Sequence, residues 1–313
     1  MKQIVSFVLI LTMLVTVFLI FPACELDIRP TSWSGKYRYD NARKYTAGAK
    51  NFDATSVRNI DIDWGAGTVI VRQDETVTDI DLRETVYCGK TDEAPAVSED
   101  EVLYTWLDGE TLRIKYLKSK WGTRKVDAKN LTVLIPAGKT LGTVTIQTDS
   151  ANAEVSSITA DCAQLKSKSG DLASSFSILT ELDCDSASGD VSAYGEIGLA
   201  KLHSTSGKIY ASMEKDIGQL EMESTSGEIT LVSYETILPG TTTIQTVSGS
   251  VKLMFMTGTA YVIEYRTTSG TYNSTQFENE IQEENRHIAG VDGKNISVET
   301  VSGNLTVTRF VKS

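Results

Sequence analysis

Apolar and polar residues alternate along most of the chain, and the alternation is interrupted at near-regular intervals by a Ser-Gly pair. The alternation has a period of two, as in Ile229-Thr230-Leu231 and Ile296-Ser297-Val298, which is the pattern of a β-strand with one buried face. An apolar or aromatic residue stands five positions before each glycine: Leu165, Cys184, Leu202, Met222, Ile244, Tyr265 and Val298. Another stands two positions after it: Leu172, Val191, Ile209, Ile229, Val251, Tyr272 and Leu305. A strand is therefore predicted on each side of every Ser-Gly, and helix is excluded there.

The Ser-Gly pairs belong to a tetrad, [Ser/Thr]-x-Ser-Gly, whose glycines are Gly170, Gly189, Gly207, Gly227, Gly249, Gly270 and Gly303. A period near twenty residues predicts a stacked repeat. The parity of the inward positions changes across the glycine, so the chain must turn there. We expect glycine because it adopts a positive φ or because it has no side chain to clash with the next coil. We expect the serine before it to hydrogen-bond locally or to a stacked serine.

These patterns predict an all-β protein, a single-stranded parallel β-helix (β-solenoid) with coils of about 20 residues. The regular solenoid is expected over residues 141–312, from about Thr143 to Phe310, with Leu165, Leu202, Ile244 and Val298 in one inward column. Residues 55–140 are expected to supply atypical strands as an N-terminal β cap. In the first regular coil, Ala153 is expected to replace the turn glycine.

The chain starts with a charge-asymmetric apolar segment. Lys2 precedes an uncharged run from Ile4 to Phe21, and Glu25 follows it; the run is near the length that spans a bilayer, and the charge order directs the rest outward. Residues 1–23 are therefore predicted to be a signal peptide or membrane anchor, 24–54 a linker and 55–312 the repeat domain. Ala23-Cys24 resembles the end of a lipoprotein cleavage site, so lipid attachment at Cys24 and an uncleaved anchor remain alternatives. Both place the domain on the extracytoplasmic face of the cell membrane.

Charge and composition exclude several classes of partner and of functional site. With 30 Lys+Arg against 41 Asp+Glu the net charge is −11, which argues against a nucleic-acid partner. His203 and His287 are the only histidines and no Cys-x-x-Cys occurs, so neither a catalytic triad, a metal site nor a cofactor is predicted. Both histidines are expected to be lone and exposed. The other three cysteines, Cys88, Cys162 and Cys184, are expected to be small buried side chains, with a Cys162–Cys184 disulfide as the alternative.

Two sets of charged residues bear on function. The carboxylates Asp183, Asp185, Glu221 and Glu223 alternate with apolar residues and should point outward; the column after the glycines, which begins with Asp171 and Asp190, is expected to avoid like-charge stacking. A basic segment contains Arg113, Lys115, Lys118, Lys120, Arg124, Lys125 and Lys129. It would contact anionic lipid headgroups or wall polymers, or it is simply a hairpin with a charged outer face.

Three features resemble a known family: Asp63-Trp64-Gly65 between two strands, the run Leu131 to Pro136, and the repeated Ser-Gly-x-[Ile/Val/Leu]. Together, over about residues 55–310, they resemble the bacterial putative-adhesin β-strand-repeat family, a domain of unknown function in exported or membrane-anchored envelope proteins. The resemblance implies no catalytic residues, and some members accompany envelope-stress two-component systems.

The expected function is a non-catalytic, membrane-tethered, adhesin-like or structural binding module of a bacterial cell envelope. Its expected partners are the membrane and, beyond it, envelope polymers or membrane proteins; the oligomeric state is left open. An accessory protein of envelope-stress signalling is the alternative. A β-helical polysaccharide-active enzyme is the third interpretation, and it requires carboxylates that converge on one groove.

Overall fold

The computed structural model describes residues 40–87, 102–116, 128–213, 218–234, 240–275, 280–283, 286–289 and 293–311. All of them fall in one structural unit, which comprises residues 39–118 and 122–313. The predicted signal peptide or anchor, Cys24, Cys88, Lys118, Lys120, Arg124 and Lys125 lie outside the described residues. Within the described ranges the regular structure is β-strand apart from one 3-10 turn, η1 (Ala42–Lys44). The prediction of an all-β fold is confirmed.

The strands in chain order are β1 (Thr46–Ala47), β2 (Asn51–Phe52), β3 (Asn59–Trp64), β4 (Gly67–Asp74), β5 (Ile80–Tyr87), β6 (Tyr104–Asp108), β7 (Thr111–Lys115), β8 (Ala128–Pro136), β9 (Thr140–Thr148), β10 (Asn152–Ser156), β11 (Thr159–Ser167), β12 (Leu172–Ser186), β13 (Val191–Ser204), β14 (Ile209–Met213), β15 (Gln219–Ser224), β16 (Ile229–Ser233), β17 (Thr241–Thr246), β18 (Val251–Met256), β19 (Tyr261–Thr267), β20 (Tyr272–Ser274), β21 (Glu280–Glu283), β22 (Arg286–Ala289), β23 (Lys294–Thr300) and β24 (Leu305–Phe310).

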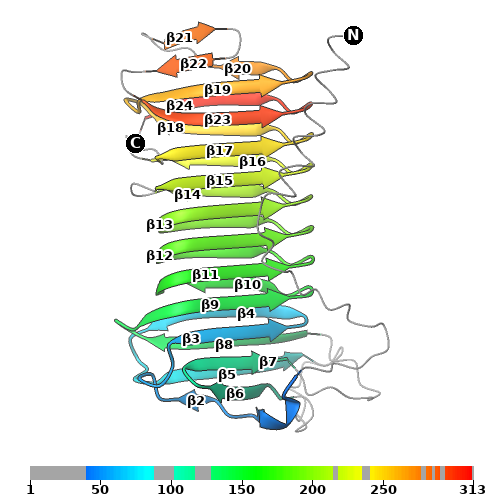
Figure 1. Ribbon diagram of the computed structural model, residues 1–313, viewed down its shortest axis with the longest axis vertical. Coiled ribbons are helices and arrows are strands. Elements are labelled where there is room, and N and C mark those ends of the chain that lie inside the picture. The colour runs from blue at the N-terminus through cyan, green and yellow to red at the C-terminus, as the bar shows by residue number, and fades with distance from the viewer. Residues whose placement is uncertain are drawn as a thin grey trace. The chain divides into compact units, whose positions relative to one another are not determined.

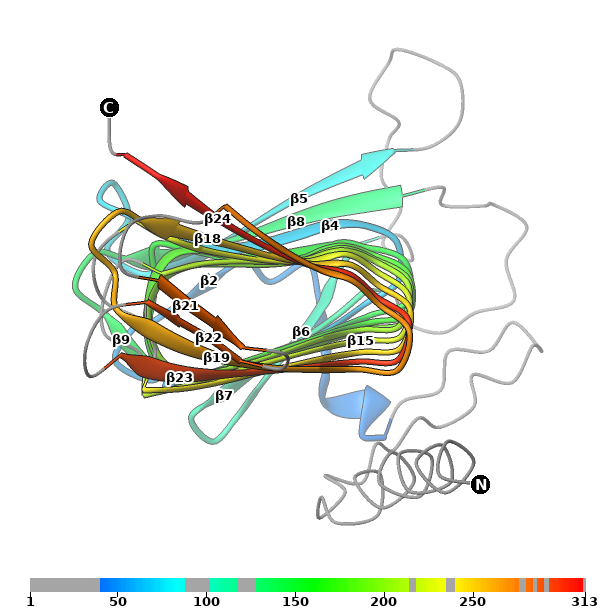
Figure 2. The same cartoon turned by 90° about the horizontal axis from the view of Figure 1, so that it is seen from above.

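Successive coils stack in parallel and form two facing sheets (Figures 1 and 2). Sheet A contains the strands that precede the glycine turn: β7, β3, β9, β11, the second halves of β12 and β13, β15, β17, β23 and β19. Sheet B contains the strands that follow it: β8, β4, β10, the first halves of β12 and β13, β14, β16, β18, β24 and β20. The long strands β12 and β13 pass from sheet B into sheet A, with a register shift between Ser175 and Ser177.

Apolar side chains fill the space between the sheets in columns along the stack. The predicted inward column is confirmed: Leu165 pairs with Cys184, Cys184 with Leu202, Leu202 with Met222, Met222 with Ile244, and Ile244 with Val298. All of these residues are buried. Burying a Leu, Ile or Val side chain stabilises the folded state by roughly 1.5–3 kcal/mol, so the alternation seen in the sequence supplies the core.

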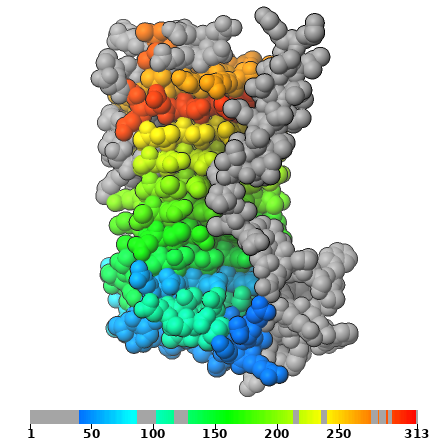
Figure 3. Space-filling view, viewed as in Figure 1, coloured from blue at the N-terminus to red at the C-terminus, as the bar shows by residue number. Residues whose placement is uncertain are grey.

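The coils do not stack in chain order at either end. At the C-terminal end β23 lies between β17 and β19 in sheet A, and β24 lies between β18 and β20 in sheet B. Figure 3 shows the same order on the surface, with the red of the last coil below the orange of β19. At the N-terminal end β3 lies between β7 and β9, and β4 between β8 and β10. The first and last coils in the sequence are therefore interior to the stack.

Antiparallel strands cover the outermost coils. β6 pairs with β7 and β5 with β8 at one end, and the two-residue strands β1 and β2 pair with β6 and β5. At the other end β22 pairs with β19, and β21 pairs with β22. Short and antiparallel edge strands protect a parallel stack from pairing with another chain. The 33-residue interval between Gly270 and Gly303 contains β21 and β22, after which the chain returns to the interior coil.

Candidate binding faces

The Ser-Gly corners are contact points between coils. A Cβ placed on any of the seven repeat glycines would lie 1.8 to 2.1 Å from a backbone carbonyl oxygen of the neighbouring coil. None of the seven has a positive φ; positive φ occurs at other glycines, such as Gly138 and Gly195. Of the two predicted reasons, only the coil clash holds. Ala151, not Ala153, occupies the glycine position of the first regular coil, because Ala153 pairs with Leu172.

The first Ser or Thr of each tetrad makes the local hydrogen bond at the corner. The sequence predicted that bond for the serine directly before the glycine. In six of the seven tetrads the side-chain oxygen of the first residue accepts a hydrogen bond from the glycine N–H at 2.7 to 2.9 Å, as Ser204 does from Gly207. Ser204 also donates to the carbonyl of Gly189 in the neighbouring coil at 2.9 Å. The serine before the glycine is exposed, as Ser188 is, and donates to a neighbouring carbonyl at 3.4 Å. These hydroxyls serve the fold.

The column after the glycines forms a second ladder. The backbone N–H of Asp190 donates to the Asp171 carboxylate at 2.9 Å, and that of Lys208 donates to the Asp190 carboxylate at 2.7 Å. The two aspartates are therefore neighbours in the stack, contrary to the expectation that like charges avoid each other. Each carboxylate accepts a backbone hydrogen bond, which offsets part of their repulsion.

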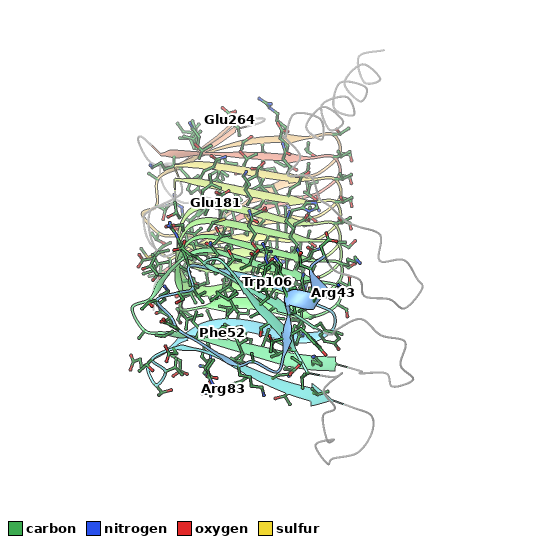
Figure 4. The ribbon with its side chains drawn as sticks, turned by 60° about the horizontal axis from the view of Figure 1, so that its bottom comes forward. Arg43, Phe52, Arg83, Trp106, Glu181 and Glu264 are labelled. Atoms are coloured by element: carbon green, nitrogen blue, oxygen red, sulfur yellow. The ribbon has the colours of Figure 1, made fainter. Side chains whose placement is uncertain are left out.

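The outer face of sheet A is charged. Asp183, Asp185, Glu221 and Glu223 point outward as expected, and Figure 4 labels Glu181 and Glu264 of the same sheet. His203 lies beside these carboxylates, and its Nδ1 is 2.7 Å from Oδ1 of Asp185. The hydrogen bond that the Asp185 carboxylate accepts raises the pKa of His203, and the same bond lowers the pKa of Asp185. Burial raises the pKa of Asp183.

His203 is thus a half-buried residue that is hydrogen-bonded to Asp185, and not the lone exposed histidine that the sequence predicted. The side chain of His287 is outside the described residues. The described charged side chains of sheet A are distributed over successive coils, and His203 is the residue on which Asp185, Glu223 and Asp183 act together.

The outer face of sheet B differs in chemistry. It carries an aromatic band, which we define as Phe176, Tyr194, Tyr210, Tyr234, Met254 and Phe310. The rings of Phe176 and Tyr194 meet edge to face with centroids 4.6 Å apart, and those of Tyr234 and Phe310 do so at 5.5 Å. Burial and a hydrogen bond with Tyr234 raise the pKa of Tyr210. Phe176 is 64% exposed. The band has no signature in the sequence, because its members come from different coils with no common spacing.

The described members of the basic segment are paired with carboxylates. Arg113 forms ion pairs with Asp61 and, at 3.0 Å, with Asp108; Lys115 pairs with Asp63 at 2.9 Å. Figure 4 shows Trp106 at this end of the stack, where Lys44 lies 4.5 Å from the centre of its ring. Contact of the whole segment with anionic surfaces stays a prediction, since four of its members are outside the described residues.

Lys129, which the sequence placed in the basic surface segment, is buried in the core instead. Its Nζ pairs with Glu84 and donates to the carbonyl of Tyr116, and it lies 5.0 Å from the ring centre of Trp64 and 4.7 Å from that of Tyr116. It occupies the corner position of its coil, opposite Gly67 in the next. At this N-terminal corner, the contacts of the Lys129 ammonium with the Trp64 and Tyr116 rings thus take the place of the Ser/Thr hydrogen bonds found at the other corners.

The two described cysteines are both free and point to opposite faces. Cys184 is in the inward column, whereas Cys162 is partly exposed on the outer face of sheet A, which corrects its expected burial. Burial raises the pKa of both thiols, that of Cys162 to about 11. Among the described residues no group of His, Cys, Asp or Glu is arranged to hold a metal ion. In the same residues no helix has the length and apolar character needed to cross a membrane.

The inward columns, the Ser-Gly corners and the parallel stack define a repeat protein of the β-solenoid class, with a different chemistry on each outer face. The chain belongs to the Toastrack DUF4097 family, whose model matches residues 57–308. This confirms the family that the sequence motifs indicated.

Several solved structures resemble the chain, among them the following three. A putative adhesin from Bacteroides fragilis has 14% identity and a TM-score of 0.46, with 83% of this chain and 95% of that one covered. A putative lipid binding protein from Parabacteroides distasonis has 12% identity and a TM-score of 0.41, with the same coverage. A putative cell adhesion protein from Clostridium sporogenes has 8% identity and a TM-score of 0.30, with 85% and 100% covered. At these values the resemblances carry no inference about ligands. No curated protein matches the chain.

Proposed function

We propose that the protein is a non-catalytic, adhesin-like binding module of a bacterial cell envelope, tethered to the extracytoplasmic face of the membrane. The observation that supports binding is the repetition of outward side chains over two continuous sheets, charged on sheet A and aromatic and hydroxyl-bearing on sheet B. Extended surfaces of stacked repeats are suited to elongated partners.

The absence of catalysis is part of the proposal. His203 is held by Asp185, and the sheet A carboxylates are spread along the stack, so nothing in the described residues pairs a nucleophile with a free general base. Glycoside hydrolysis needs only two carboxylates. The test incubates the protein with peptidoglycan, teichoic acid and common polysaccharides. Release of soluble fragments that disappears on replacing one specific carboxylate would overturn this part; binding without turnover agrees with it.

Cross-linking in native membranes, followed by identification of the attached partner, tests the binding role. An envelope polymer or a membrane protein is the expected partner. A sensor kinase as the dominant partner would favour the accessory role in envelope-stress signalling.

The tether is tested at Cys24. If the cysteine carries lipid, Cys24→Ala abolishes both lipid labelling and processing of the chain. Membrane retention with no labelling of the parent chain indicates an uncleaved anchor. A parent chain that is released from membranes without detergent contradicts both forms of the tether.

A further inference from the structure

We propose that the aromatic band of sheet B binds an uncharged polysaccharide, with its phenylalanine and tyrosine rings against the sugar rings. This inference rests on the binding role proposed above and names the ligand class and the face that takes it.

The backbone at Phe176 points to a contact site. Its φ is +52°, in the left-handed region that a bulky side chain disfavours, and its ring is 64% exposed. An exposed ring recovers little burial energy in return for this strain. The aligned corner of the neighbouring coil has Ser157, also at positive φ, and no aromatic ring. A strained and exposed aromatic residue is typical of a position that serves a ligand more than the fold.

The rings follow the stack axis. Phe176 contacts Tyr194 of the next coil, Tyr210 and Tyr234 follow in the two coils after it, and Tyr234 contacts Phe310. Neighbouring coils are ~4.8 Å apart, which is close to the length of one sugar ring in an extended chain. The rings occupy different outward columns, since Tyr194 pairs with Ser212 and Tyr210 with Thr230, so a polymer that crosses several coils would meet more than one ring.

The charge around the band selects the ligand class. In the two outward columns of sheet B that hold Tyr210 and Tyr194, from β12 to β24, the one charged residue is Lys252, and Glu228 neutralises it at 2.7 Å. The remaining neighbours are mostly Ser and Thr, such as Ser192, Thr230 and Thr308. Sheet A, by contrast, carries charges on its outer face, and the chain as a whole has a charge of −11.

The outer face of sheet B offers both kinds of contact that sugar rings make with proteins. Their C–H faces pack on aromatic rings, while their hydroxyls hydrogen-bond to Tyr, Ser and Thr. An anionic polymer would be repelled by the acidic protein and finds no unpaired cation in these columns. A lipid surface would desolvate the same hydroxyls without replacing their hydrogen bonds.

The test uses the full chain, purified in a detergent without a sugar headgroup. Binding is measured to uncharged polysaccharides such as cellulose, chitin, mannan and dextran, to an anionic polymer such as teichoic acid, and to anionic liposomes, each at low and high salt. Tyr210→Ser and Phe176→Gly change the band. Ile281→Ser is the matched control, because Ile281 is an exposed apolar residue (57%) on β21, away from the band.

We expect salt-insensitive binding to at least one uncharged polysaccharide, weakened at least about tenfold by either band variant and unchanged in the control. Phe176→Gly should keep or raise the melting temperature, since glycine accepts the left-handed backbone; a purely structural role for the ring would lower it.

Three results would overturn the inference. The first is polysaccharide binding that survives both band substitutions. The second is binding confined to teichoic acid or liposomes. The third is no polysaccharide binding by a protein that cross-links to an envelope protein in native membranes. All three leave the general binding role standing, whereas a chain that binds none of these materials and cross-links to nothing in membranes refutes the proposed function as well.

Discussion

At the scale of single residues, the repeat glycines are fixed by distance between coils and not by backbone conformation. A Cβ at position 207 would lie 2.0 Å from the carbonyl oxygen of Gly189. That carbonyl belongs to the backbone of a close-packed corner, so it cannot move aside as a flexible side chain can.

Gly207→Ala should therefore destabilise the protein by on the order of 2–4 kcal/mol, through overpacking of the corner. Gly218→Ala is the control, because its Cβ would meet its nearest atom, the carbonyl oxygen of Gly198, at 3.1 Å, and small shifts suffice. Thermal unfolding followed by circular dichroism compares the two. Equal melting temperatures for both variants would show that the coils do not approach as closely as described.

The His203–Asp185 pair predicts a pH dependence with a definite sign. The pKa of His203 is raised above 6.5, so its contribution is fully present below that value and is lost as pH rises through the folded pKa. The pKa of Asp185 is lowered below 3.8, so its contribution is present above that value and is lost as pH falls through the folded pKa. The pair should stabilise the fold most between about pH 4 and pH 6.5.

In the parent chain the melting temperature should therefore fall as the pH rises above about 6. His203→Gln should remove this pH dependence of the melting temperature, and Asp185→Asn should do the same. A parent chain whose melting temperature does not fall there, relative to His203→Gln, contradicts the ion pair.

At the scale of elements, the period of two in the sequence was sufficient to predict the strands and their inward columns, because burial of alternate side chains is a local property. Leu165, Leu202 and Ile244 lie where that alternation placed them. The positions that the sequence misjudged depend on neighbouring coils. The neighbouring coil decides whether a corner needs glycine for its φ or for its lack of a side chain. The neighbouring coil also supplies the hydrogen-bond partner of His203. Likewise, nothing in the local sequence distinguishes the buried Lys129 from the other basic residues of its segment.

The Lys129–Glu84 pair gives the prediction at this scale. Glu84→Gln keeps an oxygen that can accept the hydrogen bond from the Leu103 N–H, made at 3.0 Å in the parent, but removes the carboxylate charge that pairs with Lys129 in the core. Breaking a buried ion pair by removing one partner costs about 3–5 kcal/mol. Denaturant unfolding should show a loss of this order. Combining the substitution with Lys129→Met removes the charge and should restore much of the stability. A double variant as unstable as Glu84→Gln alone would indicate that Lys129 contributes by packing more than by charge.

At the scale of the whole solenoid domain, both ends of the stack are closed in the same way. The chain places its first and last coils inside the stack. The first coil is covered by the later strands β7 and β8, and the last coil by the earlier strands β19 and β20; antiparallel strands then cap these outer coils. The period of the repeat could not predict this, because a coil of the same composition fits equally well at either position; the 33-residue interval was the one sign of it in the sequence. A stack closed in this way cannot lose residues from its C-terminus one coil at a time.

Removal of residues 294–313 should therefore be more damaging than a longer internal deletion. It takes away β23 and β24, exposes the edges of β17 and β18, and leaves β19 and β20 without the strands that join them to the rest of the stack. Deletion of 261–289 removes β19 to β22 and joins β18 through a short loop to β23, which then continues the stack in chain order, as β16 and β17 already do. Because stability in a stacked repeat is close to a sum of coil and interface contributions, the variant with the internal deletion should have a shorter stack and unfold cooperatively at a moderately lower temperature.

The C-terminally truncated variant loses an interior coil together with both of its interfaces, so it should aggregate or become sensitive to protease. Circular dichroism and limited proteolysis of the two variants beside the parent chain make the comparison. A truncated chain that is more stable than the internal deletion would show that the last coil sits at the end of the stack and that the coils follow the order of the sequence.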